Sequence, residues 1–534
     1  MKKISLGLIA FIVALLFVFT SCNSVDKKAA LIPKDAAFVI HLNTKSLSSK
    51  LSWEEIKQTN WFRDVSSGHN DSLAKKILDD PDNSGINTNE GFVIFGKPET
   101  SHKGFLIGLS GNIKDVAAFE AFNKKISKTE NVTSNDNLKT IRFKEKGAVS
   151  WNENKFLYLF EQGLGYAIHS RMNDSGQVYQ EPAPLDLSEI AKRIFNYKKD
   201  SLLIDDDRFV TLMKEEGDVH FWVNAETAYG SGSSMGVLSF LKMDVYFRES
   251  VTASTLSFDK GRISVHAKSY SNKEMRELFK KYAGGTINTN LVKRIPSDSV
   301  IGVVALNYKP EGLKEFLKLG GLDGMVNSFF GKFDITLDDL VAATKGDLVI
   351  AVTDVGLKKH MISLGPGMDS LPTNAPSANF IFATSIGNKA AFNKLEAATK
   401  KLREGGDIPS GIFTGMNNEL FVAGSSQALI DEYLRGGNKD FPFLGKISDH
   451  PAAFYLDLNK LIRSFHDQVK DSSASRAYEA TVQMWKDIVA TGGEFKDGAI
   501  IQEAEINLVD QNTNSLKQLN VYADKLSAMN KRGF

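Results

Sequence analysis

The chain has 534 residues, 42% of them hydrophobic, and its 65 lysine and arginine side chains almost balance 64 aspartate and glutamate side chains. This composition is typical of packed globular domains and excludes a wholly disordered chain. Because the net charge is close to zero and no basic patch stands out in the sequence, we expect no binding to the phosphate backbone of a nucleic acid.

The first 21 residues have the pattern of an export signal. A cationic head, Met1-Lys2-Lys3, precedes an apolar run over residues 4–19, and small residues follow that run. A charged head, an apolar stretch and small residues before a break are the three parts of a secretory signal. The run is shorter than the roughly 20 apolar residues that a membrane span needs.

Cys22 is the only cysteine of the chain. It stands where a bacterial lipoprotein signal is cut and where the new N-terminal thiol receives its lipid. We therefore predict a lipoprotein signal peptide at residues 1–21, lipidation of Cys22 and a polar tether over residues 22–29. A cleaved secretory signal with an incidental cysteine, or an uncleaved signal anchor, is the alternative. No later run approaches the length of a membrane span, so we expect a soluble body tethered by lipid.

The first body opens with a turn, a buried strand and the start of a helix. Apolar residues fill most of both faces of residues 38–42, which predicts a buried strand. Asn43 or Thr44 is placed to cap a helix that continues through Leu47 and Leu51. Two hairpins, separated by a helix that starts near residue 112, are predicted from alternating apolar residues at 91–96 with 104–109 and at 141–151 with 155–169.

The same order of elements recurs in the second half of the chain. The opening phrase at residues 32–43 returns at residues 295–307, and both copies begin with Ile-Pro. Further segments match in the same order: 92–95 with 346–352, 105–109 with 380–384, 111–119 with 387–392, 151–157 with 416–422, and 258–263 with 495–500. The loops between them differ in length, which surface loops tolerate. This order predicts a tandem duplication, with α+β repeats at residues 30–285 and 293–526.

Within each predicted repeat the opening strand also returns in weaker form, at residues 217–224 and 450–459. Strands joined mainly by hairpins, with helices between the pairs, predict an α+β fold. Each of the two homologous bodies is then a largely antiparallel sheet covered by helices.

Three motifs resemble a known family: the signal that ends in Cys22, the phrase Ile32-Pro33-Lys34-Asp35-Ala36, and Asp80-Pro81 followed by Ser84-Gly85-Ile86 ahead of a strand. Together they resemble a lipoprotein family of Bacteroidota, the domain of unknown function 4836 family. The resemblance covers most of the mature chain, and its motifs are structural, so it implies no catalytic residues. The second body departs from the pattern, because Phe333-Asp334-Ile335 stands where the first body has Ser84-Gly85-Ile86.

The resemblance also indicates where in the cell the protein is located. Lipoproteins of this kind carry a diacyl glyceride on the cysteine, and two acyl chains suffice for stable anchoring. In this family an acidic run after the cysteine would favour export to the cell surface, and residues 23–29 carry no such run. The resemblance therefore favours a periplasmic body, with surface exposure as the alternative.

Several short patterns suggest chemistry but lack a part that the chemistry needs. Residues 80–85 resemble the start of a calcium loop, yet Gly91 stands where a bidentate glutamate is required. Residues 232–236 read Gly-Ser-Ser-Met-Gly, but no strand leads directly into them as a nucleophile elbow requires. Ser72 and Lys75 match a Ser-x-x-Lys motif without its downstream partners. A turn, a loop and a helix surface are the respective interpretations.

The nine histidines are scattered and form no metal-binding motif. His41 and His220 occupy equivalent positions in two predicted strands, which we attribute to descent within the repeat and not to a shared metal. The acidic run at residues 205–207 fits a solvated loop better than a cation site. The tryptophans are surrounded by apolar residues, so we expect them in the core and not in a glycan platform; they are Trp53, Trp61, Trp151, Trp222 and Trp485.

The leading functional hypothesis is a non-enzymatic lipoprotein of the cell envelope that binds or scaffolds an envelope protein or glycan. We expect no catalytic, cofactor-binding or metal-binding residues and no cofactor. The alternative is a periplasmic hydrolase of glycan or peptide, whose carboxylates or Ser–His pair would meet in a cleft between the two repeats.

Overall fold

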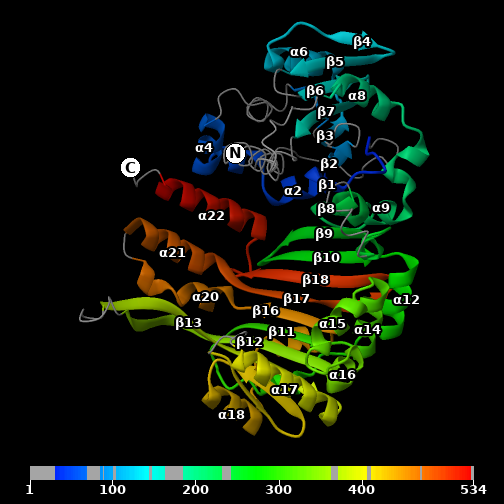
Figure 1. Cartoon of the computed structure of the whole chain (residues 1–534). Coiled ribbons are helices and arrows are strands. Elements are labelled where there is room, and N and C mark those ends of the chain that lie inside the picture. Colours follow the sequence, from blue (N-terminus) through cyan, green and yellow to red (C-terminus); the bar gives the residue numbers. More distant parts are fainter. Residues whose placement is uncertain are drawn as a thin grey trace, which may run out of the picture. The chain divides into compact units, whose positions relative to one another are not determined.

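The computed structural model describes residues 31–68, 84–87, 90–99, 104–143, 147–162, 185–230, 242–362, 371–405, 411–469 and 472–530. These residues form two compact units. Unit 1 contains the described residues of Met1–Met235, Glu249–Asp259 and Asn514–Lys531, and unit 2 contains those of Gly236–Arg248 and Lys260–Thr513. Both units combine helices with antiparallel strands, which confirms the α+β class (Figure 1).

Unit 1 is built on antiparallel strands whose hydrogen-bonded order is β9-β8-β1-β2-β3-β7-β6-β5-β4. The first strand lies between β2 and β8, so that Leu42 faces Phe92 on one side and Val219 on the other. The strands are β1 (Phe38–Leu42), β2 (Phe92–Glu99), β3 (Gly104–Asn112), β4 (Thr133–Asn135), β5 (Leu138–Phe143), β6 (Gly147–Trp151), β7 (Lys155–Gln162), β8 (Val219–Asn224) and β9 (Val251–Asp259).

The helices of unit 1 are α2 (Thr44–Lys50), α3 (Trp53–Lys57), α4 (Asn60–Gly68), α6 (Val116–Ser127), α8 (Leu187–Phe195), α9 (Asp207–Leu212), α10 (Ala225–Gly230) and α22 (Ser515–Asn530), with 3-10 turns at Lys199–Ser201 and Leu203–Asp205. Helix α6 packs on β6 and β7 through an aromatic cluster. The ring of Phe119 lies against Trp151, Phe156 and Tyr158, all of which are fully buried. Burial of these large apolar rings is a major source of stability for unit 1.

Capping residues start the helices where the sequence predicts. Asn43 caps α2, because its side chain accepts a hydrogen bond from the amide of Ser46. Asp115 caps α6 in the same way. Gly85 supports that cap: its carbonyl accepts the amides of Lys114 and Asp115, and its φ of +72° places it in the left-handed region. A Cβ at Gly85 would overlap the backbone of α6, so the family motif at 84–86 has a structural cause.

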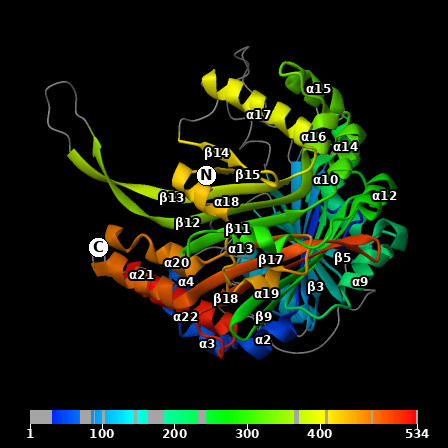
Figure 2. The ribbon, with the colours of Figure 1, turned by 90° about the horizontal axis from the view of Figure 1, so that it is seen from below.

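Unit 2 is also built on antiparallel strands, in the hydrogen-bonded order β10-β18-β17-β16-β11-β12-β13-β15-β14. Strands β12 and β13 extend far beyond their neighbours (Figure 2). The strands are β10 (Arg262–Tyr270), β11 (Val300–Asn307), β12 (Thr344–Ile362), β13 (Leu371–Ile386), β14 (Phe413–Met416), β15 (Leu420–Gly424), β16 (Ala452–Leu456), β17 (Trp485–Lys496) and β18 (Ala499–Leu508).

The helices of unit 2 are α12 (Lys273–Tyr282), α13 (Thr289–Lys293), α14 (Pro310–Leu319), α15 (Asp323–Gly331), α16 (Leu337–Ala343), α17 (Lys389–Glu404), α18 (Gln427–Arg435), α19 (Leu444–Ile447), α20 (Leu458–Arg463) and α21 (Ser472–Met484), with 3-10 turns at Met243–Tyr246 and His466–Gln468. The main core joins α13, α18 and α19 to one face of the sheet. Val303, Ala305 and Ala453 lie in this core and are almost fully buried.

The compact units divide the chain differently from the predicted repeats. The last strand and helix of the first predicted repeat, β10 and α12, belong to unit 2, where β10 pairs with β18. The last helix of the chain, α22, belongs to unit 1, where Asn520 accepts the indole N–H of Trp61 in α4 at 2.8 Å. The last helix of each predicted repeat therefore lies in the compact unit that contains most of the other predicted repeat.

The predicted signal peptide at residues 1–21, Cys22 and the tether all lie outside the described residues. Within the described ranges, no helix has the length and apolar character that crossing a membrane requires.

Candidate functional site

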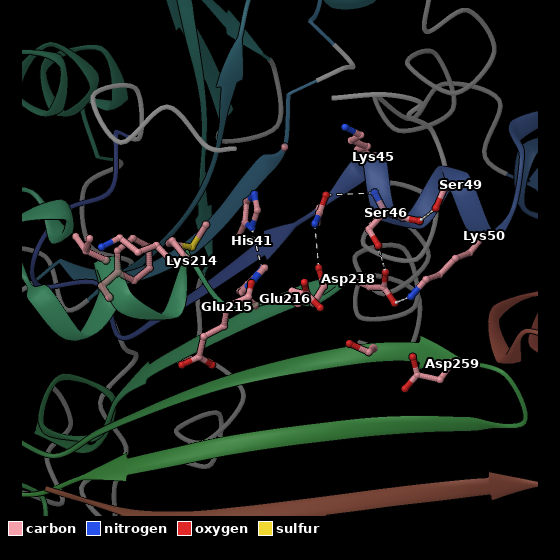
Figure 3. A pocket seen from close by; sticks show the side chains of 18 of the residues that line it. His41, Lys45, Ser46, Ser49, Lys50, Lys214, Glu215, Glu216, Asp218 and Asp259 are labelled. Carbon is pink, nitrogen blue, oxygen red and sulfur yellow. Dashed lines mark hydrogen bonds and ion pairs between the residues drawn. The ribbon is translucent and has the colours of Figure 1, made fainter. Parts of the chain in front are cut away.

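A cavity of about 730 Å³ lies in unit 1, and residues of β1, β8, β9, α2 and the segment between α9 and β8 line it (Figure 3). Its volume is within the range of small-molecule sites, which are roughly 300–1,000 Å³. His41 and His220 line one side, and Ser46, Lys50 and Asp218 line another. We define this cavity as the unit 1 pocket.

Asp218 organises the polar side of the unit 1 pocket. Its side chain is fully buried and accepts hydrogen bonds from the Ser46 hydroxyl at 2.5 Å, the Lys50 ammonium at 2.6 Å and the amide of Phe258 at 2.5 Å. In Figure 3, Ser46 and Lys50 project from α2 toward Asp218. A buried carboxylate is stable only when its charge and lone pairs are satisfied in this way. The network therefore fixes α2 to β8 and β9.

The two pocket histidines form a directly bonded pair. They face each other on neighbouring strands, because β1 and β8 pair in a register that places His41 opposite His220. Their Nδ1 atoms are 3.1 Å apart, and their ring centroids are 5.1 Å apart. Both side chains are buried, with exposed fractions of 6% for His41 and 3% for His220.

The surrounding groups determine which nitrogen of each histidine carries a proton. Nε2 of His220 lies 2.9 Å from the carbonyl oxygen of Glu215, which only accepts, so this nitrogen is the donor. In a neutral imidazole the other nitrogen is then an acceptor, and Nδ1 of His220 accepts from Nδ1–H of His41. Nε2 of His41 is consequently unprotonated and carries a lone pair. We assign these tautomers from the hydrogen-bond geometry.

Burial keeps the pair neutral. Burial, together with the smaller effect of the neighbouring His220, lowers the pKa of His41 from 6.5 to about 3. Burial also lowers the pKa of His220, against the opposing effect of the Glu215 carbonyl. A charged imidazole in this environment would lose its hydration, and for His220 this loss outweighs the attraction of the Glu215 and Asp218 carboxylates.

The lone pair on His41 Nε2 is an unused acceptor. Among the residues that the structure describes, no group donates a hydrogen bond to it. It faces Gly91, which also lines the unit 1 pocket, and a Cβ at Gly91 would overlap Nε2 and the carbonyl oxygen of Leu42. Glycine at this position therefore allows the backbone to pack closely against the His41 ring, and Nε2 is itself buried.

The rest of the lining mixes charges with apolar surface. Lys45 and Lys214 contribute positive charge, and Glu215, Glu216 and Asp259 contribute negative charge. Figure 3 shows Asp259 on β9, across the pocket from α2. The apolar part of the lining comes from Ile204, Phe209, Val210 and Met213, at and around α9.

The structure corrects one part of the interpretation of the histidines. The sequence analysis attributed their equivalent positions to descent within the repeat and did not anticipate that they touch. Strand β8 pairs directly with β1, and this brings His41 and His220 together. Ser46, Lys50 and Asp218 were also missed as site residues. Their one sequence signal is an aspartate directly before an apolar strand, which is common in ordinary turns.

Other predicted features have structural roles or lie outside the described residues. Asp205 pairs with Lys34, and Asp206 caps α9 and binds Arg208 at 2.7 Å, so the acidic run at 205–207 is engaged in folding. The Gly-Ser-Ser-Met-Gly segment, the Ser-x-x-Lys pair, Cys22 and residues 80–83 lie outside the described residues. The core prediction holds for the most buried tryptophans, which are Trp53, Trp151 and Trp222.

The described residues contain no cluster of three or more histidine, cysteine, aspartate or glutamate side chains placed to hold a metal ion. His41 offers a single nitrogen lone pair, and His220 uses both of its nitrogens in hydrogen bonds. What the pocket provides is a rigid set of donors and acceptors around a cavity that a small molecule could fill.

The fold and the pocket define an α+β protein with a polar site in one of its units. The chain belongs to the family described as Domain of unknown function (DUF4836), whose model matches residues 29–408. No curated protein matches the chain.

Solved structures that resemble the chain include two crystal forms of TP0453. Form I is 15% identical, covers 46% of this chain and 81% of that chain, and has a TM-score of 0.26. Form III is 14% identical, covers 50% of this chain and 89% of that chain, and has a TM-score of 0.25. Likenesses this low carry no argument about function.

Proposed function

We propose that this protein is a lipid-anchored, non-enzymatic binding protein of the bacterial cell envelope, and that the unit 1 pocket is its ligand site. The observation that supports the proposal is the unit 1 pocket itself, a cavity of about 730 Å³ whose lining combines charged, polar and apolar side chains. Small-molecule sites combine apolar walls with a few placed polar groups, and the lining of this pocket offers both. Ser46 donates to Asp218 and not to a histidine, so this pocket does not favour the hydrolase alternative.

A photo-crosslinking residue at position 213 tests the binding function in living cells. Met213 lines the unit 1 pocket, and a matched control probe replaces Phe413, which is 40% exposed in unit 2. We expect adducts from position 213 that are absent from position 413. Equal labelling from both positions, or none from position 213, would contradict the proposed binding function.

The proposed location in the cell envelope rests on the signal pattern and on Cys22. With two acyl chains on its sulfur, Cys22 would hold the mature protein in a membrane, and the body would lie in the periplasm. Replacement of Cys22 by alanine should move the protein from the membrane fraction to the soluble fraction and abolish labelling by a palmitate analogue. Unchanged membrane retention would refute lipid anchoring.

Protease treatment of intact cells distinguishes a periplasmic body, which is protected, from a surface body, which is cleaved.

We also propose that the chain arose by tandem duplication in an envelope lipoprotein of the Bacteroidota type. The strand order β9-β8-β1-β2-β3-β7-β6 of unit 1 has its counterpart in the order β17-β16-β11-β12-β13-β15-β14 of unit 2. Backbone contacts also correspond: the amide of Asn43 donates to Asp218, and the amide of Asn307 donates to Pro451. These correspondences support the proposal, because independent origins would give no reason for shared pairing and register.

A further inference from the structure

One side of the unit 2 sheet is apolar but only partly covered. The other side carries the main core, where Val303, Ala305 and Val349 are buried. Successive side chains of a strand point to opposite sides of its sheet, so the residues between these three face away from the core. An antiparallel sheet with one open side normally carries polar residues there. In unit 2 the open side consists mainly of valine, isoleucine, leucine and phenylalanine.

Three rows of strand partners form this surface, which we call the open face. They cross β16, β11, β12 and β13 and run from Leu456 to Phe380, from Phe454 to Phe382 and from Ala452 to Thr384. Directly opposite residues of antiparallel strands lie on the same side of the sheet, so the rows form one continuous surface. Its most exposed side chains are Ile350, at 40%, and Phe454, at 37%.

The open face offers almost no hydrogen-bonding group. In the three rows Thr384 is the one polar side chain, and it is buried and donates to the carbonyl oxygen of Asp347 at 2.7 Å. Each of the four strands pairs with a neighbour on both sides, so the backbone amides are used in the ladders. A protein interface forms about one hydrogen bond per 100–200 Å². The open face therefore suits an occupant that needs no hydrogen bond, which is hydrocarbon.

The size of the open face also distinguishes between occupants. Four strands about 4.8 Å apart and three rows about 6.6 Å apart give an area of roughly 400 Å². This area is about half of the roughly 800 Å² that each partner contributes to a stable protein interface. One leaflet of a bilayer core is about 15 Å thick. An acyl chain of a membrane lipid therefore fits across the four strands, which together span about 19 Å.

Helix α17 makes a flat membrane an unsuitable occupant. Its residue Phe392 packs on Phe421 of β15, with 5.1 Å between the ring centroids. Phe421 is the strand partner of Thr384, so it lies on the same side of the sheet as the open face. A helix about 10 Å in diameter thus stands above one end of this side. A planar bilayer would meet α17 before it reached Ile350, whereas a single acyl chain can lie beside the helix.

We propose that the open face of unit 2 binds the acyl chain of a single membrane lipid, which lies across β16, β11, β12 and β13 with its head group in water beyond the rows. Removal of the chain and of the partly exposed side chains from water drives the binding. Ile350 and Phe454 contribute the largest exposed fractions to this contact. This site is separate from the unit 1 pocket, and its existence does not depend on a ligand in that pocket.

A photo-crosslinking residue at position 350 tests the proposal in living cells. Position 413 is the matched control, because Phe413 is also 40% exposed but lies on the covered side of the sheet, opposite Gly424, whose partner Ile381 is in the core. We expect adducts with the masses of membrane lipids from position 350 and at least fivefold fewer from position 413. Protein adducts from position 350, including a second copy of this chain, would overturn the proposal. Equal lipid labelling at both positions, or no adduct at position 350, would do the same.

A chain-length series on the unsubstituted full chain measures the same contact in CHAPS, a detergent without an acyl chain. Decanoyl, lauroyl and myristoyl lysophosphatidylcholine compete with a fluorescent fatty acid, each below its micelle-forming concentration. Complete burial of a methylene strengthens binding about fourfold, and a chain on an open face buries about half of each methylene, so we expect about twofold tighter competition per methylene. Equal competition by the three lipids would exclude an acyl-chain contact.

The substitution Ile350→Gln locates the contact on the open face. It places a polar group in the middle row at a partly exposed position, so it should weaken lauroyl competition at least fivefold without unfolding unit 2. Phe413→Gln, at the same exposed fraction on the covered side, should leave competition unchanged. Urea unfolding shows whether each variant is folded. Unchanged competition in a folded Ile350→Gln protein overturns the site. If this variant does not fold, the crosslinking at position 350 and the chain-length series decide.

Discussion

The same place in the two units holds a polar pair in one case and an apolar pair in the other. In unit 1, strands β1 and β8 bring His41 opposite His220. In unit 2, strands β11 and β16 bring Ala305 opposite Ala453. Both alanines lie in the main core of unit 2, with exposed fractions of 1% and 5%. One backbone arrangement therefore supports a pocket in unit 1 and a closed core in unit 2.

The neighbouring positions differ in the same sense. The backbone carbonyl that accepts the amide of Asn43 belongs to Asp218, whereas the one that accepts the amide of Asn307 belongs to Pro451, which has no charge. The residue before the facing strand position also differs. In unit 1 Gly91 precedes Phe92, which faces Leu42. In unit 2 Asp347 precedes Leu348, which faces Leu306. The difference teaches that the backbone does not define the site. A few side chains determine whether this part of the unit forms a packed core or a pocket.

The largest expected effect comes from placing the histidine pair in unit 2. Ala305→His combined with Ala453→His would overpack a close-packed core and bury polar nitrogens without their unit 1 partners. Together these effects should cost roughly 4 kcal/mol of local stability. Hydrogen exchange of the β11 amides measures this loss. A change under about 1 kcal/mol would show that unit 2 retains room for a polar pair and would remove the distinction between the units.

Removal of the Asp218 side chain should have the next largest effect. Asp218→Ala leaves the Lys50 ammonium, the Ser46 hydroxyl and the amide of Phe258 without their acceptor. Breaking a buried ion pair from one side typically costs about 3 kcal/mol or more. The free energy of unfolding of unit 1 in urea measures it. Lys517→Met is the control, because its partner Glu55 is about half exposed and this pair is worth less than about 1 kcal/mol.

The histidine pair should make the stability of unit 1 depend on pH. The pKa of His41 is about 3 in the folded protein and near 6.5 in the unfolded chain, so the folded state is favoured fully above pH 6.5. Below pH 6.5 His41 becomes protonated in the unfolded chain but stays neutral in the folded protein. The free energy of unfolding therefore falls by about 1.4 kcal/mol per pH unit until pH 3. Between pH 7 and pH 5 we expect a loss of roughly 2 kcal/mol, to which His220 adds in the same direction.

Urea unfolding at each pH measures this loss, with the nearby groups Glu215 and Asp218 unchanged. His41→Ala combined with His220→Ala gives unit 1 the apolar pair of unit 2 and should flatten the pH dependence over this range. An equal slope in the double variant would mean that other groups set the pH response.

The smallest expected effect is that of Gly91→Ala. The new methyl group would overlap His41 Nε2 and the carbonyl oxygen of Leu42, and the local shift should cost about 1–2 kcal/mol. Part of this cost should disappear in a His41→Ala background, where only the clash with Leu42 remains. A double-mutant cycle based on unfolding free energies measures this coupling. Strict additivity would mean that His41 Nε2 does not occupy the space in front of Gly91.

The sequence was sufficient to predict the class of fold and several local elements. Apolar alternation identified the strands around residues 38–42 and 92–96, and the cap at Asn43 starts a helix as predicted. These features depend on neighbours within a few residues, which is why pattern and spacing reveal them. The predicted boundaries at residues 30–285 and 293–526 remain predictions, since compactness and repeat ancestry are different properties.

The candidate site was not predictable in the same way. His41 and His220 are 179 residues apart, and their contact depends on β8 pairing with β1 in one particular register. A shift of one residue would turn either histidine to the opposite face of the sheet. Asp218 bonds with Ser46 and Lys50 across 172 and 168 residues. No local pattern encodes such long-range contacts, and a lone histidine in a strand usually belongs to the core.

The position of helix α22 determines when unit 1 can finish folding during synthesis. Its residues Lys517 and Asn520 bond with Glu55 and Trp61, more than 450 positions earlier in the chain. A ribosome releases the N-terminal partners first and the closing helix last. The surface of α4 that receives α22 thus stays uncovered for almost the whole of synthesis. A chain truncated before residue 515 should consequently depend on chaperones, and unit 1 should be its first protease-sensitive part.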